Sequence, residues 1–181
     1  MTNYAAFLRG INVGGHKPVP MEKLKNSFES LRFKNVRTLL ASGNVVFEAH
    51  PTSTATLEQK IKEKLKKTFG HEIGVLVRTI EELQHLSESQ PFEGIDVTPQ
   101  TRLYVTFLSE KTKSHLKIPY ASPNKNFRIL GASKYEVCSV LILSPTNRSV
   151  DVMNVLEKEF GHKVTTRNWN TIVRVLKTQQ M

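Results

Sequence analysis

The sequence contains a single cysteine, Cys138, among 181 residues. One cysteine excludes an internal disulfide and a metal site made of several thiolates. Cys138 lies within the apolar run "EVCSVLIL". Cysteine behaves there as a small hydrophobic side chain, so we expect a buried thiol rather than a reactive one.

Long hydrophobic runs are also missing. No window approaches the roughly 20 apolar residues that a membrane-spanning helix needs, and no basic segment leads into an apolar stretch at the N-terminus. We therefore expect a cytoplasmic protein without a membrane partner.

Acidic residues that could serve catalysis are sparse. Aspartate occurs only as Asp96 and Asp151, and the six histidines are scattered along the chain. Paired-carboxylate hydrolysis, carboxylate-bound magnesium and a histidine metal site have little support in this pattern. We expect no metal and no cofactor, and the sequence leaves open whether the protein is an enzyme.

Positive charge, by contrast, is abundant. Lysine and arginine number 26 against 16 acidic residues, which gives a formal net charge of +10. Such a surface attracts nucleic acid, phosphorylated ligands and other anions. Nucleic acid and anionic small molecules are therefore the possible partners that composition favours.

The first half of the chain alternates short apolar runs with helical stripes. Residues 3–9 predict a strand, and apolar residues spaced three or four apart then predict two helices. Between these helices, two apolar runs flank residues 41–44 and predict a β-hairpin. Gly70 stands where a helix would end, ahead of a further strand. The helical stripes are Met21, Leu24, Phe28 and Leu31, and Leu57, Ile61, Leu65 and Phe69.

The second half echoes the first. The segment "YVTFL" at 104–108 resembles "YAAFL" at 4–8, "LGASK" at 130–134 resembles "LASGN" at 40–44, and "LEKEFGHKV" at 156–164 resembles "LKKTFGHEI" at 65–73. We predict an α+β fold of two ferredoxin-like βαββαβ units related by internal duplication, plus a C-terminal helix. The predicted boundaries are 1–88 for the first unit, 89–101 for a linker, 102–167 for the second unit and 168–181 for the helix.

The stretch "LRGINVGGHKPVP" at 8–20 comes close to a phosphate-binding P-loop. It departs from that motif because Lys17 does not directly follow Gly15, Pro18 and Pro20 intervene, and no Ser or Thr follows the lysine. We therefore do not expect nucleotide hydrolysis. Two interpretations stay open, namely a tight glycine-rich exit from a strand and an anion-binding nest.

A ferredoxin-like topology would gather this loop, the hairpin turn and the turn after the second helix at one end of the sheet. The candidate anion-binding residues at that end are Arg9, Gly10, Asn12, Gly14, Gly15, His16, Lys17, Ser42, Gly43 and Asn44. A second candidate is "TTRNWN" at 165–170, where Arg167 and Asn168 precede a predicted helix start. The alternative there is that Asn168 only caps the helix and Trp169 anchors it in the core.

Three motifs together carry a resemblance to a known family. "FLRGINVGGHKPVPM", "LLASGNVVFEA" and "TTRNWNTIVRVLK" resemble the bacterial proteins grouped as the domain of unknown function 1697 family. The resemblance spans almost the whole chain. It implies a bacterial cytoplasmic protein with an α+β fold of two related units, and it supplies no activity and no catalytic residue.

Three functions remain as hypotheses. The first is a basic binding module for nucleic acid or another polyanion through the glycine-rich loop. The second is an enzyme or sensor for a small anionic metabolite, bound between the loop at 9–17 and either the hairpin at 42–44 or the Arg167 helix start. The third is a protein-interaction scaffold built from the sheets and the terminal helix.

Overall fold

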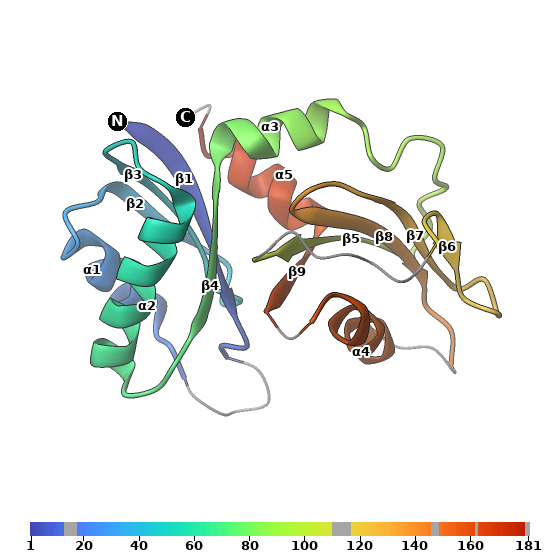
Figure 1. Ribbon diagram of the computed structural model, residues 1–181, viewed down its shortest axis with the longest axis horizontal. Coiled ribbons are helices and arrows are strands. Elements are labelled where there is room, and N and C mark those ends of the chain that lie inside the picture. Colours follow the sequence, from blue (N-terminus) through green and yellow to red (C-terminus); the bar gives the residue numbers. More distant parts are fainter. Residues whose placement is uncertain (13–17, 110–116, 146–148, 162, 180–181) are drawn as a thin grey trace. The chain divides into compact units, whose positions relative to one another are not determined.

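The computed structural model describes residues 1–12, 18–109, 117–145, 149–161 and 163–179 (Figure 1). The chain forms two compact units, one made of Met1–His85 with Arg174–Met181 and the other of Leu86–Val173. The described residues contain five helices and two antiparallel sheets. The fold is therefore mixed α+β, as the sequence predicts.

The first unit contains a four-stranded sheet with the strand order β2-β3-β1-β4. Helix α1 connects β1 to β2, and helix α2 connects β3 to β4. Every neighbouring pair is antiparallel, so the end of β1, the β2–β3 turn and the start of β4 lie at one end of the sheet. The elements are β1 (Thr2–Arg9), α1 (Met21–Glu29), β2 (Lys34–Leu39), β3 (Asn44–Ala49), α2 (Thr54–Phe69) and β4 (Gly74–Thr79).

Helix α2 has defined start and stop signals. The Ser53 hydroxyl accepts a hydrogen bond from the backbone N–H of Thr56 at 3.1 Å, and Gly70 ends the helix in the left-handed conformation with φ of 78°. The buried face of α2, formed by Leu57, Ile61 and Leu65, packs into the core of the first unit. The helical stripe in the sequence thus marks the face that is buried.

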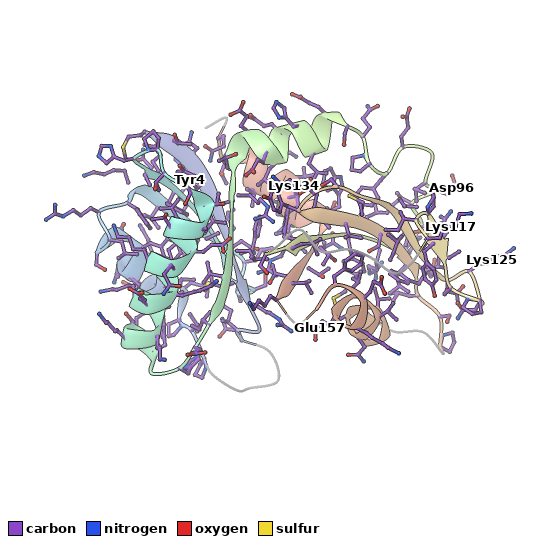
Figure 2. The ribbon with its side chains drawn as sticks, viewed as in Figure 1. Tyr4, Asp96, Lys117, Lys125, Lys134 and Glu157 are labelled. Atoms are coloured by element: carbon purple, nitrogen blue, oxygen red, sulfur yellow. The ribbon has the colours of Figure 1, made fainter. Side chains whose placement is uncertain are left out.

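Aromatic rings fill the centre of this core. Phe47 stacks on Tyr4 and on Phe33, with ring centroids 5.6 and 4.6 Å apart, and Phe28 meets Phe47 edge-on. Tyr4 is labelled on β1 in Figure 2. Its hydroxyl donates to the carbonyl of Thr52 at 3.2 Å, which leaves the polar end of the ring satisfied.

The other face of the first sheet is buried as well. Ala5 and Phe7 of β1, Val46 of β3 and Leu76 of β4 are each at most 4% exposed. A strand buried on both faces is apolar at successive positions, which explains the run "AAFL". Neither face of β1 therefore presents an exposed aromatic ring.

The second unit contains a five-stranded sheet with the strand order β6-β7-β8-β5-β9. Helix α4 (Ser149–Phe160) lies between β8 and β9 in the chain, and its Val152, Leu156 and Phe160 join the core of this unit. The strands are β5 (Thr101–Leu108), β6 (Tyr120–Ala121), β7 (Phe127–Ala132), β8 (Glu136–Ile142) and β9 (Val164–Asn168). Strand β6 pairs only with β7 among the described strands.

Two further helices complete the chain. Helix α5 (Trp169–Lys177) follows β9 directly. Helix α3 (Ile80–Glu88) follows β4, where the sequence analysis expected no helix. Its start is a capping box, in which Thr79 N–H donates to the Glu82 carboxylate at 2.7 Å and Glu82 N–H donates to the Thr79 hydroxyl at 3.0 Å. Within the described residues, no helix is both long and apolar enough to cross a membrane.

Candidate functional site

The end of the first sheet at which β1 stops and β3 and β4 begin carries the predicted site residues Arg9, Gly10, Asn12, Ser42 and Gly43. We call this region the loop end and define it by residues 9–12, 40–43 and 69–72. Phe7 pairs with Asn44 of β3, and Arg9 pairs with Gly74 of β4. The loop after β1, the hairpin turn and the turn after α2 therefore meet here.

Asn12 fastens the two ends of the glycine-rich loop. Its side-chain amide donates to the carbonyls of Ala41 at 2.8 Å and Val19 at 3.1 Å, and its side-chain oxygen accepts from the N–H of Val19 at 2.8 Å. Asn12 has φ of 55°, a left-handed conformation that asparagine tolerates better than most residues. The neck of the loop is thus closed by one side chain, which also ties it to the hairpin turn.

Gly43 is required by close packing as well as by conformation. It has φ of 75°, and a Cβ at this position would lie only 2.5 Å from Ile11 Cδ1 and 2.9 Å from Leu8 Cβ. Its carbonyl accepts a hydrogen bond from the N–H of Leu8 at 2.8 Å. The hairpin turn is therefore locked against the end of β1 and against the buried Ile11.

The Asn44 side chain forms its hydrogen bonds within the hairpin turn. Asn44 is fully buried, and its amide donates to the Leu39 carbonyl at 2.8 Å and to the Ser42 hydroxyl at 3.1 Å. Buried polar groups that already have partners stabilise the fold and are not exposed to a ligand. The structure therefore gives the Asn44 side chain a structural role.

Arg9 and Gly10 mark where the chain leaves the sheet. Arg9 is half-buried, and its stem lies against Gly74, where an added Cβ would come 3.2 Å from Arg9 Cβ. Gly10 is exposed with φ of 65°. The predicted residues Gly14, Gly15, His16 and Lys17 lie outside the described residues. The role of the predicted set in binding an anion stays a prediction.

Cationic side chains from both helices converge on the loop end. Lys23, in the first turn of α1, places its Nζ 5.3 Å from the ring centroid of Phe69 at the end of α2. Lys66 and Lys67 occupy the last turn of α2, and Lys66 contacts the Glu72 carboxylate at 2.9 Å. This hydrogen bond and the lysine charge lower the pKa of Glu72. The start of α1 adds the positive end of its helix dipole.

His71 is a polar group that the sequence analysis did not include in the site. Its Nδ1 lies 3.1 Å from the carbonyl of Phe69, and this contact assigns the proton of the neutral ring to Nδ1. Its Nε2 is buried and has no hydrogen-bond partner in the described part of the chain. With the proton on Nδ1, Nε2 is a hydrogen-bond acceptor. Only its position directly after the Gly70 helix stop could have drawn attention to it.

The second predicted candidate, at "TTRNWN", has a different character. Asn168 accepts a hydrogen bond from the N–H of Asn170 at 2.9 Å and so caps α5, and the Trp169 ring packs edge-on against Phe92 at 5.3 Å. Arg167 donates to the carbonyl of Thr166 at 2.9 Å. Burial lowers the pKa of its guanidinium to about 10. These contacts give the segment a structural role, and its anion-binding role remains a prediction.

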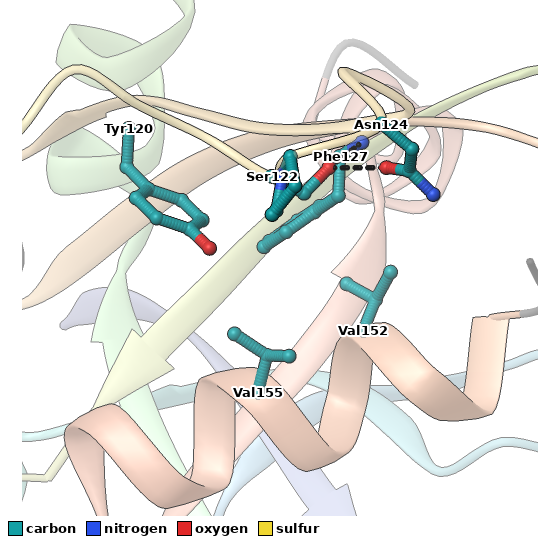
Figure 3. A pocket seen from close by; sticks show the side chains of 7 residues that line it. Tyr120, Ser122, Asn124, Phe127, Val152 and Val155 are labelled. Carbon is teal, nitrogen blue, oxygen red and sulfur yellow. Dashed lines mark hydrogen bonds between the residues drawn. The ribbon is translucent and has the colours of Figure 1, made fainter.

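The second unit has a pocket that the sequence analysis did not anticipate. It measures about 270 Å³ and lies between the β6–β7 hairpin and α4, with Phe127, Val152 and Val155 as its apolar lining (Figure 3). On its rim, Ser122 donates to the Asn124 side-chain oxygen at 2.7 Å and accepts from Phe127 N–H at 3.0 Å. The pocket is mainly apolar, and Ser122 and Asn124 use their side chains to stabilise the β6–β7 turn. Lys117 and Lys125 lie at the same end of this unit (Figure 2).

Metal ligands do not cluster in the part of the chain that the structure describes. No group of three or more histidine, cysteine, aspartate or glutamate side chains there is arranged to hold an ion. Cys138 is buried, and burial together with the nearby charge of Glu136 raises the pKa of its thiol to about 12. A thiol with this pKa is protonated at neutral pH and is a poor nucleophile.

Comparison with known proteins gives the fold and the family. No curated protein matches this sequence. A solved structure of the conserved bacterial protein SP0830 from Streptococcus pneumoniae is similar over 100% of this chain and 99% of that chain, with 21% identity and a TM-score of 0.73. A likeness at this identity supports the fold alone.

The sequence motifs at the loop end fall within the part of the chain that a family model matches. That model covers residues 1–134, and so includes the neck of the glycine-rich loop and the β2–β3 turn. The chain therefore belongs to the family described as Protein of unknown function (DUF1697), which is the family that the sequence resembles.

Proposed function

We propose that this protein is a binding module that engages a polyanion, with nucleic acid as the first candidate, through the loop end of the first unit. The observation that carries the proposal is the Asn12 neck. It joins Asn12 to Val19 at the loop end, where Lys23 contacts the Phe69 ring and Lys66 contacts Glu72.

The chemistry of this region favours phosphate contacts. Cations and glycine-rich backbone N–H groups are suited to phosphate oxygens. The buried face of the first sheet argues against a second mode, in which exposed aromatic rings on strands stack on bases, because Phe7 is fully buried. We therefore propose binding that depends on backbone charge and is indifferent to base sequence.

The direct test is fluorescence anisotropy with labelled single-stranded and duplex oligonucleotides at increasing salt. Phosphate-driven binding predicts a linear fall of log affinity with log salt concentration. It also predicts similar affinities for oligonucleotides of different sequence. Absence of binding at low salt would contradict the proposal.

A matched pair of variants locates the binding surface. Lys67 and Lys158 are both exposed lysines in the last turn of a helix, but only Lys67 is on the helix that leads into the loop end. We expect Lys67→Gln to weaken binding by about twofold to fivefold and to reduce the salt slope, because one phosphate contact is lost. Lys158→Gln should leave binding unchanged. Equal losses in both variants would mean that affinity follows net charge and not this site.

A second candidate function uses the same region for a small anionic metabolite. The buried and unbonded Nε2 of His71 favours it, because a single polar atom held in place suits a small ligand better than a flexible polymer. Thermal-shift screening against nucleotides, sugar phosphates and carboxylates discriminates the two functions. Selective stabilisation by one compound that is lost in His71→Ala supports the metabolite. A uniform null response with oligonucleotide binding intact supports the polyanion.

We also propose that the two sheets come from duplication of a ferredoxin-like unit, with units at 1–88 and 102–167, a linker at 89–101 and the C-terminal helix at 168–181. Support comes from the strand order, since β7-β8-β5-β9 repeats the pattern of β2-β3-β1-β4. Gly70 and Gly161 both follow a helix with positive φ. Leu8 N–H at the end of β1 donates to the Gly43 carbonyl at 2.8 Å. Leu108 N–H at the end of β5 donates to the Tyr135 carbonyl at 2.7 Å, in the corresponding position of the second sheet.

A further inference from the structure

A polar pocket lies in the first unit, on strands β1, β2 and β3. It measures about 240 Å³, and its polar lining consists of Asn3, Asn35, Arg37, Glu48, Thr178 and Gln179. None of these residues belongs to the loop end. Pairing in the sheet shows which side chains share a face, because Asn3 is opposite Glu48 and Arg37 is opposite Val46. Glu48 lies two residues from Val46 on β3, so Asn3, Arg37 and Glu48 project from the same face.

The pocket contains both signs of charge. Arg37 and Glu48 are diagonal neighbours on adjacent strands. The Cβ atoms of such residues lie somewhat less than about 7–8 Å apart. Among the described residues, neither forms an ion pair with the other or with a third side chain. Opposite charges that line one small pocket and remain apart leave space for a group that meets both.

Each charge is held in place by a neutral partner. The Arg37 guanidinium donates to the Thr178 carbonyl at 3.2 Å, and the Glu48 carboxylate accepts from the Asn35 amide at 2.7 Å. Each contact uses one atom of the charged group. The remaining guanidinium N–H groups and the second carboxylate oxygen are therefore available for a ligand.

We infer that this pocket binds a small zwitterion, a free α-amino acid with a short polar side chain, whose carboxylate meets Arg37 and whose ammonium group meets Glu48. Arginine matches a carboxylate with two parallel N–H donors. A carboxylate side chain accepts from an ammonium group. The amides of Asn3 and Gln179 supply neutral donors and acceptors for a polar side chain, and the volume excludes large ligands.

The test is isothermal titration calorimetry of the full chain with glycine, L-serine and L-asparagine. We expect saturable binding of at least one of them. N-acetyl-L-serine, which lacks the ammonium group, and L-serinamide, which lacks the carboxylate, should bind at least tenfold more weakly than L-serine. The absence of saturable binding at millimolar amino acid would overturn the inference, and so would equal affinity for L-serine and both analogues.

Charge-neutral variants assign the two contacts. Arg37→Gln and Glu48→Gln should each weaken amino acid binding at least tenfold, while their melting temperatures show that they are folded. Arg37→Gln should also reduce the preference for L-serine over L-serinamide, and Glu48→Gln the preference for L-serine over N-acetyl-L-serine. The matched controls are Lys67→Gln and Glu63→Gln, which change exposed charges of α2 outside the pocket. If the controls weaken binding as much as the pocket variants, the inference is wrong.

This outcome is independent of the polyanion proposal. Lys67→Gln is expected to weaken oligonucleotide binding and to leave amino acid binding unchanged. For Arg37→Gln and Glu48→Gln, the measured quantities are the affinity and the selectivity for amino acids. Failure of either proposal therefore leaves the other standing.

Discussion

At the scale of single residues, Asn12 and Gly43 decide the geometry of the loop end. Asn12 supplies hydrogen bonds that no apolar residue could replace, and Gly43 supplies the absence of a side chain. Both positions belong to the set of candidate anion-binding residues that the sequence predicts. In the structure, Asn12 bonds to Val19 and Ala41, and Gly43 packs against Leu8 and Ile11, while their role in binding an anion stays a prediction.

Replacing Asn12 should loosen the neck. Asn12→Ala removes three partly exposed hydrogen bonds and places alanine at φ of 55°, and together these effects should lower the free energy of unfolding by about 2 kcal/mol. Urea denaturation followed by circular dichroism measures the change. Asn26→Ala, at an exposed position of α1, is the control and should change stability by less than about 0.5 kcal/mol. A neutral Asn12→Ala would show that the neck does not depend on this side chain.

Two glycine substitutions distinguish the stability cost of backbone strain from that of overpacking. Gly10 and Gly43 both have positive φ, but an added Cβ meets nothing within 4 Å at Gly10 and meets Ile11 at 2.5 Å at Gly43. Gly10→Ala should cost about 1 kcal/mol of stability from strain alone, and Gly43→Ala about 3 kcal/mol because overpacking is added. Thermal unfolding of the two variants gives the comparison. Equal losses would mean that the β2–β3 turn moves to accept the methyl group.

The Cys138 thiol gives a pH prediction. Its pKa is raised to about 12 in the folded protein, above the ordinary value of about 8.5 for an unfolded chain. The folded state therefore holds its proton more tightly, so this contribution to stability is complete below pH 8.5 and is lost as the pH rises toward 12. Cys138→Ser should show a smaller loss of stability between pH 8.5 and 10.5. Reaction of the native thiol with Ellman's reagent at pH 7.5 should be slow and become fast in denaturant.

At the scale of elements, the residues that begin and end helices are correctly predicted from the sequence at α2 and α5. Gly70 ends α2 and Asn168 caps α5, as the residue types predict. Helix α3 was missed although Thr79 and Glu82 form the Thr-x-x-Glu signature of a capping box. Its apolar stripe of Ile80, Leu83 and Leu86 begins directly after the apolar strand β4, so the stripe is easily taken for a continuation of that strand.

Removing the cap should fray this helix. Thr79→Ala deletes the hydroxyl that accepts from Glu82 N–H, at a cost of about 1 kcal/mol. Amide hydrogen exchange should quicken in the first turn of α3 and remain unchanged in α2. Thr68→Ala, on α2, serves as the control, and faster exchange in α3 of that variant would indicate a general loss of stability instead.

At the scale of the whole molecule, the sequence predicts the mixed α+β class and the family, but it does not predict where the polar pocket lies. That pocket depends on pairings distant in the chain, since Arg37 reaches Thr178, and on the irregular register between Lys34 and Arg37. No local pattern encodes either feature. The loop end was predicted better, because its residues are close in sequence to strand ends that a known topology brings together.

The Asn12 neck also has a consequence for protein engineering. Because Asn12 and Val19 are joined directly, the five positions between Asn12 and Pro18 are bracketed by a fixed attachment of known spacing. Changes of sequence at these positions need not disturb the hydrogen bonds that hold the attachment. We expect exchange of these five residues to leave the pairing of β1 with β3 unchanged, so these positions could serve to display short sequences.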